Sequence, residues 1–339
     1  MIEAFAGNPD EWDEFVHDSD GSTHCHLFGW RRVIERVFGH ECLYFAERDA
    51  SGRLAGVLPL VRVKSLLFGH YLVSMPFLNA GGPIGSRDAI LRLATHAAHL
   101  TGREGATLLE LRSRQPLPVD LTVSHRRITV VLDLPPGEPG RLWDLLPAKV
   151  RTQVRRPLKE GAEVRFGLDQ VGSFHAVFAH HMRDLGTPAL PRGFFECIAE
   201  TFPNDVWFGC VYLDSRPVAC GCGFRWGSEF EMTWASALRR YNHLAPNMLL
   251  YWGFLERAAR EGVTLFNFGR CAPGGSTHRF KQQWATRDVP LWWYQLAAGT
   301  RAATPSPRDG RFALGPLVWR HMPVALATAL GPRIVRYIP

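Results

Sequence analysis

One pattern of about ten residues occurs twice in the chain, at a spacing of about 160 residues. Residues 103–112 read Arg-Glu-Gly-Ala-Thr-Leu-Leu-Glu-Leu-Arg, and residues 260–268 read Arg-Glu-Gly-Val-Thr-Leu-Phe-Asn-Phe, with Arg270 two residues further on. Each copy follows an apolar helical pattern, and similar hairpin sequences at 49–56 and 214–221 precede them in the same order. Solenoid repeats have periods of roughly 20 to 50 residues, so this longer spacing indicates a duplicated α/β domain with mixed sheets.

The domain boundary is predicted at the segment richest in proline and glycine, Pro-Pro-Gly-Glu-Pro-Gly at 135–140. It separates a first domain at residues 1–135 from a second at 136–298, which fits the two domains expected for 339 residues. Residues 299–339 read as a Pro/Gly/Ser linker followed by a basic amphipathic tail. The tail either packs on the domains or lies on an anionic membrane surface, and the sequence leaves both open.

The region from Glu229 to Tyr294 predicts a strand, a basic loop, a helix, a second strand and a polar turn. Residues 229–237 alternate, so Phe230, Met232 and Trp234 are expected on one face of a half-buried strand. The helix that follows carries apolar residues three and four positions apart and ends at a glycine. The Gly-rich polar segment after the second strand is of a kind that carries function on a rigid scaffold.

Composition and charge narrow the class of protein. Apolar residues make up 46% and charged residues 21%, which is ordinary for a folded domain. The net charge of +7 favours anionic partners such as nucleotide phosphates, RNA, sugar phosphates or an acidic membrane surface. No apolar run approaches the roughly 18 residues needed to span a bilayer, so any membrane contact is expected to be peripheral.

Seven cysteines, an odd number without framework spacing, and the lack of a signal-peptide pattern at the start predict a cytoplasmic protein. His24-Cys25-His26 and Cys220-Gly221-Cys222 each offer two possible zinc ligands, but neither has the familiar paired spacing. We therefore expect buried thiols and no metal site.

Three short segments of the second copy are informative: Pro246-Asn247 before the helix, Phe266-Asn267-Phe268-Gly269-Arg270 after it, and Phe280-Lys281. They resemble the FemAB branch of the GNAT N-acyltransferase superfamily. The Gly-x-Gly pyrophosphate loop usual in GNAT proteins is missing. The resemblance implies two tandem GNAT-like domains, and FemAB proteins are known for transferring amino acids from aminoacyl-tRNA onto peptidoglycan precursors.

A narrower resemblance runs over nearly the whole chain, to the FemAB-related subfamily associated with exosortase (PEP-CTERM) and exopolysaccharide systems. It is carried by residues 56–60, 63–65, 68–69, 73–77, 110–112 and 323–337. It implies a cytoplasmic acyl- or aminoacyltransferase of envelope or exopolysaccharide biosynthesis, with aminoacyl-tRNA or acyl-CoA as donor and no tightly bound cofactor.

The resemblance assigns catalysis to Lys281, whose ammonium would stabilise the charge that develops during acyl transfer. A general base must accept the proton of the attacking amine, and the predicted candidates are Glu231 and Glu229, with Glu110 and His278 left open. Cys271, beside Arg270, is a further candidate as a nucleophile with a lowered pKa, but no partner motif accompanies it.

Cationic and polar residues near predicted loops and helix starts are the candidates for binding the donor and the acceptor. A helix N-terminus favours anions, and an arginine can hold a phosphate or carboxylate with two hydrogen bonds. The predicted binding residues are Arg270, Arg239, Arg240, Asn247, Lys64, Ser65, Arg112, Arg151 and Arg155. Asn247 is alternatively only a helix cap, and Arg151 and Arg155 only a solvated face.

Two other functions remain compatible with these residues. One is an acyl-CoA-dependent N-acetyltransferase, which the missing Gly-x-Gly loop weakens. The other is a non-catalytic module that keeps the fold and binds an anionic sugar or RNA. The expected partners are thus an anionic or nucleotide-linked acceptor and, for the aminoacyl reaction, charged tRNA.

Overall fold

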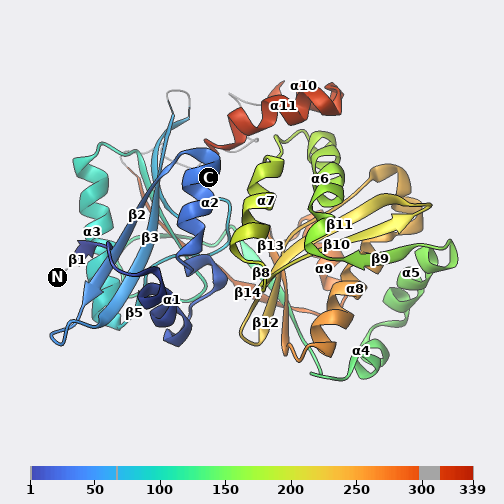
Figure 1. The fold of residues 1–339 in the computed structure, drawn as a ribbon, viewed down its shortest axis with the longest axis horizontal. Helices are drawn as coiled ribbons and strands as arrows, with labels where there is room; N and C mark the ends of the chain where they lie inside the picture. The colour runs from blue at the N-terminus through green and yellow to red at the C-terminus, as the bar shows by residue number, and fades with distance from the viewer. Residues whose placement is uncertain (1, 66–67, 298–313, 339) are drawn as a thin grey trace. The chain divides into compact units, whose positions relative to one another are not determined.

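The computed structural model describes residues 2–65, 68–297 and 314–338, and these form two compact units (Figure 1). The first unit comprises the chain up to Arg126 together with a segment that begins at Pro290 and the last residues from Val335. The second runs from Arg127 to Val289 and includes the C-terminal helices as far as Ile334. Each unit is built on one mixed sheet.

The sheet of the first unit has the order β1-β2-β3-β4-β6-β15-β7, with the short β5 paired to β3. The strands are β1 (Ile2–Ala4), β2 (Glu41–Arg48), β3 (Leu54–Ser65), β4 (Gly69–Ser74), β5 (Ile84–Gly85), β6 (Leu108–Ser113), β7 (Thr122–Ser124) and β15 (Trp292–Ala297). The helices are α1 (Pro9–Asp18), η1 (His24–His26), α2 (Gly29–Phe38) and α3 (Arg87–Arg103).

Helices cover both faces of this sheet, with α3 on one side and α1 and α2 on the other (Figure 1). Alternation along β2 explains why, since neighbouring side chains of a strand point to opposite faces. Phe45 belongs to the apolar cluster that includes Leu93 and Ala97 of α3. Tyr44 instead stacks on Trp12 of α1, with ring centroids 5.0 Å apart.

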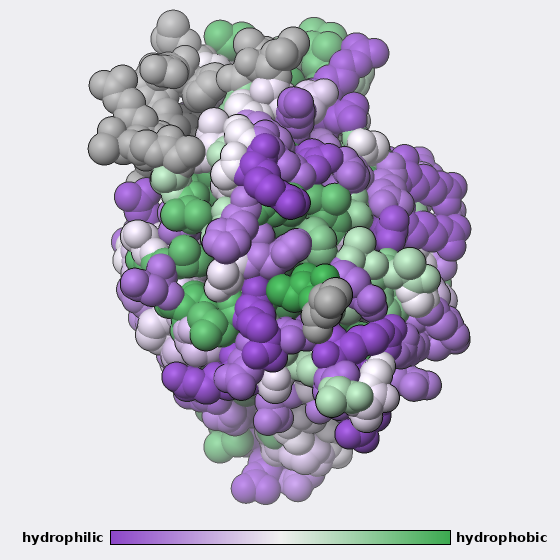
Figure 2. Space-filling model, turned by 90° about the vertical axis from the view of Figure 1, so that its left-hand side faces the viewer, coloured by the Kyte–Doolittle hydropathy of each residue, from purple (hydrophilic) through white to green (hydrophobic). Residues whose placement is uncertain are grey.

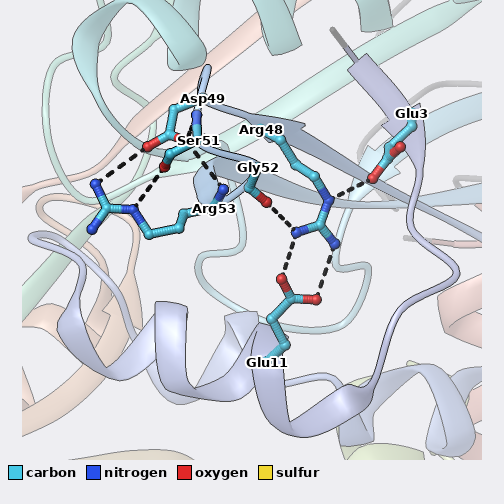
Figure 3. A network of polar contacts seen from close by, with 7 residues as sticks. All are labelled: Glu3, Glu11, Arg48, Asp49, Ser51, Gly52 and Arg53. Atoms are coloured by element: carbon cyan, nitrogen blue, oxygen red, sulfur yellow. Dashed lines mark hydrogen bonds and ion pairs between the residues drawn. The ribbon is translucent and has the colours of Figure 1, made fainter.

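The turn between β2 and β3 is held by its own polar residues, as the sequence pattern predicted for a hairpin there (Figure 3). The Asp49 carboxylate accepts hydrogen bonds from the backbone N–H groups of Ser51 (2.8 Å) and Arg53 (3.1 Å). Beside the turn, Arg48 donates to Glu3 and Glu11 and so joins β1 and α1 to the hairpin (Figure 3). These contacts fix this edge of the sheet in the first unit.

The second unit repeats this plan. Its sheet has the order β14-β8-β13-β12-β11-β10-β9. The strands are β8 (Ile128–Asp133), β9 (Glu163–Phe166), β10 (Val206–Leu213), β11 (Arg216–Trp226), β12 (Glu229–Ala237), β13 (Leu265–Cys271) and β14 (Arg287–Pro290). The helices are α4 (Pro139–Leu145), α5 (Ala148–Lys159), η2 (Leu168–Gln170), α6 (Val171–Leu185), α7 (Arg192–Thr201), η3 (Arg239–Leu244), α8 (Pro246–Arg260) and α9 (Ser276–Gln282).

The predicted alternation of β12 is broken by a β-bulge. Phe230 and Met232 pack in the core that α8 shares with the sheet, as expected. Thr233 is the extra residue of the bulge, because Gly223 pairs with Met232 while the preceding Cys222 pairs with Trp234. Trp234 therefore faces the other layer, where its ring packs edge-on against Phe195 of α7 at 5.4 Å.

The two units match residue by residue in their central parallel pair. Leu108, Leu109 and Glu110 of β6 pair with β4, and Leu265, Phe266 and Asn267 of β13 pair with β12. The offset is the same throughout, 265 − 108 = 157. The preceding helices both close with a left-handed glycine, Gly105 (φ 62°) and Gly262 (φ 80°). The duplicated α/β architecture predicted from the repeat is therefore present.

The units exchange strands near the predicted boundary, which differs from a simple division at residue 135. β8 lies before that residue, yet it pairs with β13 in the second sheet. β15 follows the second unit, yet it pairs with β6 and β7 in the first sheet. Local composition cannot reveal this exchange, because an apolar strand fits either sheet equally well.

The C-terminal tail contains two helices, α10 (Leu314–His321) and α11 (Val324–Val335). The predicted linker at 299–310 lies outside the described residues. Among the described residues, no helix is long and apolar enough to cross a membrane. On the face of the molecule that Figure 2 presents, hydrophilic and hydrophobic residues are interspersed.

Candidate active site of the second unit

The candidate site lies where the parallel pairing of β12 and β13 ends. Three residue pairs form the ladder, the last being Glu231 with Asn267, although both strands continue. On its other side β13 carries a bulge, with one extra residue between Asn267 and Arg270 relative to β8. Gly269 sits in this bulge at φ 75°, and a Cβ there would lie 2.4 Å from the carbonyl oxygen of Met232. Only glycine fits, so the bulge carbonyls have a fixed direction.

These bulge carbonyls bind the side chain of Lys281. The residue lies on α9 and is only 3% exposed. Its Nζ donates to the carbonyl oxygens of Gly269 at 2.6 Å and Arg270 at 3.1 Å. Lys281 is one of four lysines in the chain, and the other three are exposed. A buried ammonium held by two main-chain carbonyls is thus a distinctive feature of this unit.

Burial lowers the pKa of Lys281 from 10.5 to about 8. The neighbouring Cys271 and the Glu231 carboxylate oppose this effect, and the charge of Arg270 adds to it. Burial also raises the pKa of the Cys271 thiol, which excludes the lowered pKa that the nucleophile hypothesis required. Lys281, Glu231 and Arg270 are therefore close enough to influence one another, and we call them the Lys281 site.

The lowered pKa predicts a measurable pH dependence of stability. Between about pH 8 and pH 10.5 the unfolded chain keeps a proton that the folded Lys281 has lost, so the free energy of unfolding rises with pH. We expect this group to contribute about 2 kcal/mol between about pH 7.5 and about pH 9.5. Urea unfolding of the wild type and of Lys281→Met measures the contribution as the difference in slope. Parallel pH profiles for the two proteins would contradict a lowered pKa.

Glu231 and Glu229, the predicted general bases, lie on the same strand near Lys281. Glu231 is 4% exposed. Glu229 is half-buried, and its Oε1 accepts a hydrogen bond from Nδ2 of Asn267 at 2.8 Å. Oδ1 of Asn267 accepts from the backbone N–H of Gly269 (2.8 Å) and from the hydroxyl of Thr129. Asn267 thus connects Glu229 to the bulge that holds Lys281.

Asn267 belongs to the candidate site, and sequence reasoning placed it in a motif without assigning it a role. It is 1% exposed in the middle of an otherwise apolar strand. The repeat contained the signal, because Glu110 occupies the matching position in the first copy. A polar residue at both equivalent buried positions indicates that each unit builds a hydrogen-bond network there.

His278, the other candidate base on this side, has a structural position. Its Nδ1 accepts a hydrogen bond from the backbone N–H of Gly274 at 2.9 Å. Its Nε2 must then carry the proton, and it donates to the carboxylate of Asp288 at 2.9 Å. With both nitrogens engaged, His278 connects the Gly-rich turn to β14 and is not placed to accept a proton from a substrate.

The basic loop after β12 is η3, and it leads directly into α8. Arg239 and Arg240 are exposed there, eight and nine residues after Glu231 and beyond the end of β12 at Ala237. The cap prediction for Asn247 is wrong, since α8 is capped by the left-handed Ala245 and begins at Pro246. Asn247 lies in the first turn, and its buried Oδ1 has no hydrogen-bond partner among the described residues.

Arg151 and Arg155 lie on α5 and contact α4. Arg151 donates to the carbonyl oxygen of Asp144 at 3.1 Å, and the Arg155 guanidinium lies 5.1 Å from the ring centre of Trp143. Arg156 of the same helix donates to the carbonyl oxygen of His243 in η3. The basic helix therefore packs beside the loop that carries Arg239 and Arg240, and ligand binding by Arg151 and Arg155 stays a prediction.

Arg112, predicted to bind substrate, is buried inside the first unit. It is 1% exposed, and its guanidinium pairs with Glu110 at 2.8 Å. It also donates to the carbonyl oxygen of Leu78 at 2.9 Å and lies 4.4 Å from the ring centre of Trp293. The structure does not support a binding role, because these contacts engage the side chain with the protein itself. In the alignment of the two repeats, Arg112 corresponds to Gly269. The first unit therefore has a buried arginine at the position where the second unit has its bulge.

Lys64 and Ser65 end strand β3 of the first unit, next to residues 66–67, which lie outside the described part of the chain. Lys64 is exposed, and the hydroxyl of Ser65 accepts a hydrogen bond from the backbone N–H of Phe68 at 3.3 Å. This hairpin position is compatible with the predicted acceptor binding but does not test it.

The cysteines are all buried free thiols, and Cys220 and Cys222 lie within β11. Burial lowers the pKa of His24 to about 3 and that of His26 to about 4, which favours neutral imidazoles. Nδ1 of His26 lies 3.0 Å from the backbone nitrogen of Thr23, so this residue supports a local turn. Across the described residues, no three His, Cys, Asp or Glu side chains are grouped as metal ligands.

Comparison with known proteins identifies the class of fold. Residues 148–282 match the family described as "Acetyltransferase (GNAT) domain". This segment contains α5, the central strands β10 to β13, and Lys281 in α9. Together with the two duplicated mixed sheets, the match defines a tandem GNAT-like acyltransferase fold.

Solved structures resemble the chain over most of its length. A structure of FemX aligns with a TM-score of 0.63 at 13% identity, over 87% of this chain and 97% of that one. L-PGS from Bacillus licheniformis aligns with a TM-score of 0.57 at 10% identity, over 96% and 98%. A tandem GNAT protein of the clavulanic acid pathway aligns with a TM-score of 0.52 at 15% identity, over 89% of this chain and 99% of that one. No curated protein sequence matches the chain.

Proposed function

We propose that the protein transfers an acyl or aminoacyl group to an amine and so forms an amide, with the chemistry at the Lys281 site. The observation that carries the proposal is the buried ammonium of Lys281, fixed by the carbonyls of Gly269 and Arg270. Two of its three protons are donated to these carbonyls, which leaves the third for the oxyanion of a tetrahedral intermediate. An ammonium held in advance in a site of low dielectric stabilises such a charge strongly.

The reaction requires the amine nitrogen to bond to the acyl carbon while the bond from that carbon to the ester oxygen or thioester sulfur breaks. The attacking amine loses a proton, and the leaving group gains one. Glu231 is our candidate for accepting the proton, because it is buried beside Lys281. Its carboxylate also raises the pKa of Lys281 and so helps to keep the ammonium charged.

We infer that the donor has an anionic part bound near Arg239 and Arg240. The part of β12 from Glu231 to its end at Ala237 is about 20 Å long at the usual rise per residue. Arg239 and Arg240 follow in η3, so we infer an extended donor. Pro246 lacks an N–H group at the first position of α8, where GNAT proteins usually offer backbone donors to a pyrophosphate. This feature supports aminoacyl-tRNA over acyl-CoA. The role that we propose in cell-envelope or exopolysaccharide biosynthesis rests on the sequence resemblance to FemAB-related proteins of exopolysaccharide systems.

The test separates the donors. Protein purified from its source is analysed by native mass spectrometry for bound ligand, and then supplied with labelled aminoacyl-tRNAs or acetyl-CoA and a panel of nucleotide-linked amino acceptors. We expect labelled amino acid in the acceptor, and tRNA binding that weakens as salt increases. Thiol release from acetyl-CoA without aminoacyl transfer would show that the donor is acyl-CoA and not aminoacyl-tRNA. Ligand binding without turnover of either donor, unchanged in Lys281→Ala, would indicate a binding module.

A further inference from the structure

The two C-terminal helices contain buried residues and make close backbone contacts with the second unit, and the buried residues are Trp319 of α10 and Ala327 and Gly331 of α11. In α11, Gly331 lies against the backbone of Ala189, and a Cβ at Gly331 would be 3.2 Å from its nitrogen. In α10, the carbonyl of Pro316 lies against Gly186, the left-handed glycine that ends α6. These close approaches hold both helices against the end of α6 and the segment that follows it.

The same helices also carry three exposed large apolar residues, although Trp319 of α10 is buried. Leu317 is 53% exposed, Val318 is 64% exposed and Leu326 is 47% exposed, whereas Ala327 of α11 is buried. Leu185, the last residue of α6, is also exposed. Soluble helices normally bury their large apolar side chains and expose polar ones. Leu317, Val318 and Leu326 depart from this pattern and mark a candidate interaction surface.

The charges around this surface have one sign. Residues 314–338 contain no aspartate or glutamate, and they include Arg320, His321 and Arg333, all three exposed. Arg320 reaches over the end of α6 and donates to the carbonyl oxygen of Leu185 at 3.4 Å. The acidic residue at this end of α6, Asp184, is paired with Arg183 at 3.0 Å. Arginines therefore border the apolar residues without an uncompensated acidic group nearby on α6.

We propose that α10 and α11 dock on the surface of an anionic lipid bilayer. Leu317, Val318 and Leu326 would enter the boundary between headgroups and acyl chains, and Arg320 and Arg333 would contact lipid phosphates. Exposed apolar side chains bordered by arginines have the chemistry of helices that lie in the membrane interface. The helices are short, so docking is reversible and peripheral. The proposal rests on this surface alone and is independent of the proposed transferase activity.

Vesicle flotation of the full-length protein tests the proposal. We expect the wild type to float with vesicles of phosphatidylcholine containing phosphatidylglycerol, and to bind vesicles of phosphatidylcholine alone much more weakly. Leu317→Ser with Val318→Ser is expected to reduce the partition coefficient about tenfold. Arg320→Gln and Arg333→Gln are each expected to reduce binding to the anionic vesicles about fivefold, since each arginine contributes separately near a charged surface.

The matched control is Leu145→Ser with Leu158→Ser on α4 and α5, because Leu145 is 64% exposed, like Val318, and Leu158 is 47% exposed. This variant should float like the wild type. Thermal unfolding and gel filtration confirm that all variants are folded. Absence of flotation, or flotation unaffected by the Leu317 and Val318 changes, would overturn the proposal. A dimer that dissociates in the Leu317→Ser, Val318→Ser variant would instead assign the surface to a second copy of the chain.

Discussion

Replacing Lys281 with methionine is expected to lower kcat of the transfer reaction by about 100- to 1,000-fold, the usual effect of removing one oxyanion donor. Methionine keeps most of the side-chain volume but has no charge and no proton to donate. The wild-type rate should also fall as pH increases through about 8, because the ammonium is lost at its lowered pKa. Steady-state assays across this pH range measure both effects.

The matched control for this substitution is Lys159→Met, which removes an exposed lysine of α5. It should leave kcat and its pH profile unchanged. Lys159→Met should be as stable as the wild type, whereas Lys281→Met is expected to be less stable by about 1 to 3 kcal/mol, because the carbonyls of Gly269 and Arg270 lose their donor. A Lys281→Met protein with normal kcat would exclude the ammonium from catalysis. If Lys281→Met loses both its activity and its folded state, the variant Lys281→Arg is used instead, because it keeps the positive charge. A folded Lys281→Arg protein then tests the role of the charge in catalysis.

Arg112→Met is expected to lower the free energy of unfolding by about 3 to 5 kcal/mol, the usual cost of breaking a buried ion pair on one side. Glu110 is fully buried and would keep Gln295 as a donor but lose the Arg112 guanidinium. Urea denaturation measures the change. The double variant Arg112→Met, Glu110→Leu should be more stable than Arg112→Met alone, because it leaves no unpaired charge.

A surface pair provides the comparison. Arg31 and Glu35 form an i,i+4 ion pair on α2 at 3.0 Å, with both side chains exposed. Arg31→Met should therefore change the stability by about 0.5 kcal/mol or less. If Arg112→Met had wild-type stability and a raised KM, the original prediction of substrate binding would be restored.

The repeat was the most informative part of the sequence. Its alignment at Leu108 and Leu265 predicted a pairing register that the structure reproduces in both sheets. The bounds of β12 were also predictable, because apolar and polar residues alternate until the bulge at Thr233. Alternation of apolar and polar residues indicates which side chains of a strand are buried. It therefore predicts a strand correctly where the backbone is regular.

The sequence was less informative about residues whose roles depend on distant partners. Arg112 and Arg270 end similar motifs, yet one closes a buried ion pair and the other supplies a carbonyl to Lys281. The difference arises at Gly269, where a left-handed backbone makes the bulge. Ala245 adopts a left-handed conformation without being glycine, so the start of α8 was misplaced at Asn247. Tertiary packing determines these left-handed conformations. They cannot be predicted from the conformational preferences of the individual residues.

The pairing of β15 with β6 has a consequence for how the protein is made. The ribosome synthesises the N-terminal part first, but this sheet lacks β15, the strand between β6 and β7, until residue 297 has been synthesised. About 180 further residues must be translated after β6, which takes about 10 to 40 s at ordinary elongation rates. During that interval the edge of β6 has no partner, and Glu110 lacks Gln295. The nascent first half must therefore wait for the second before it can complete its own core.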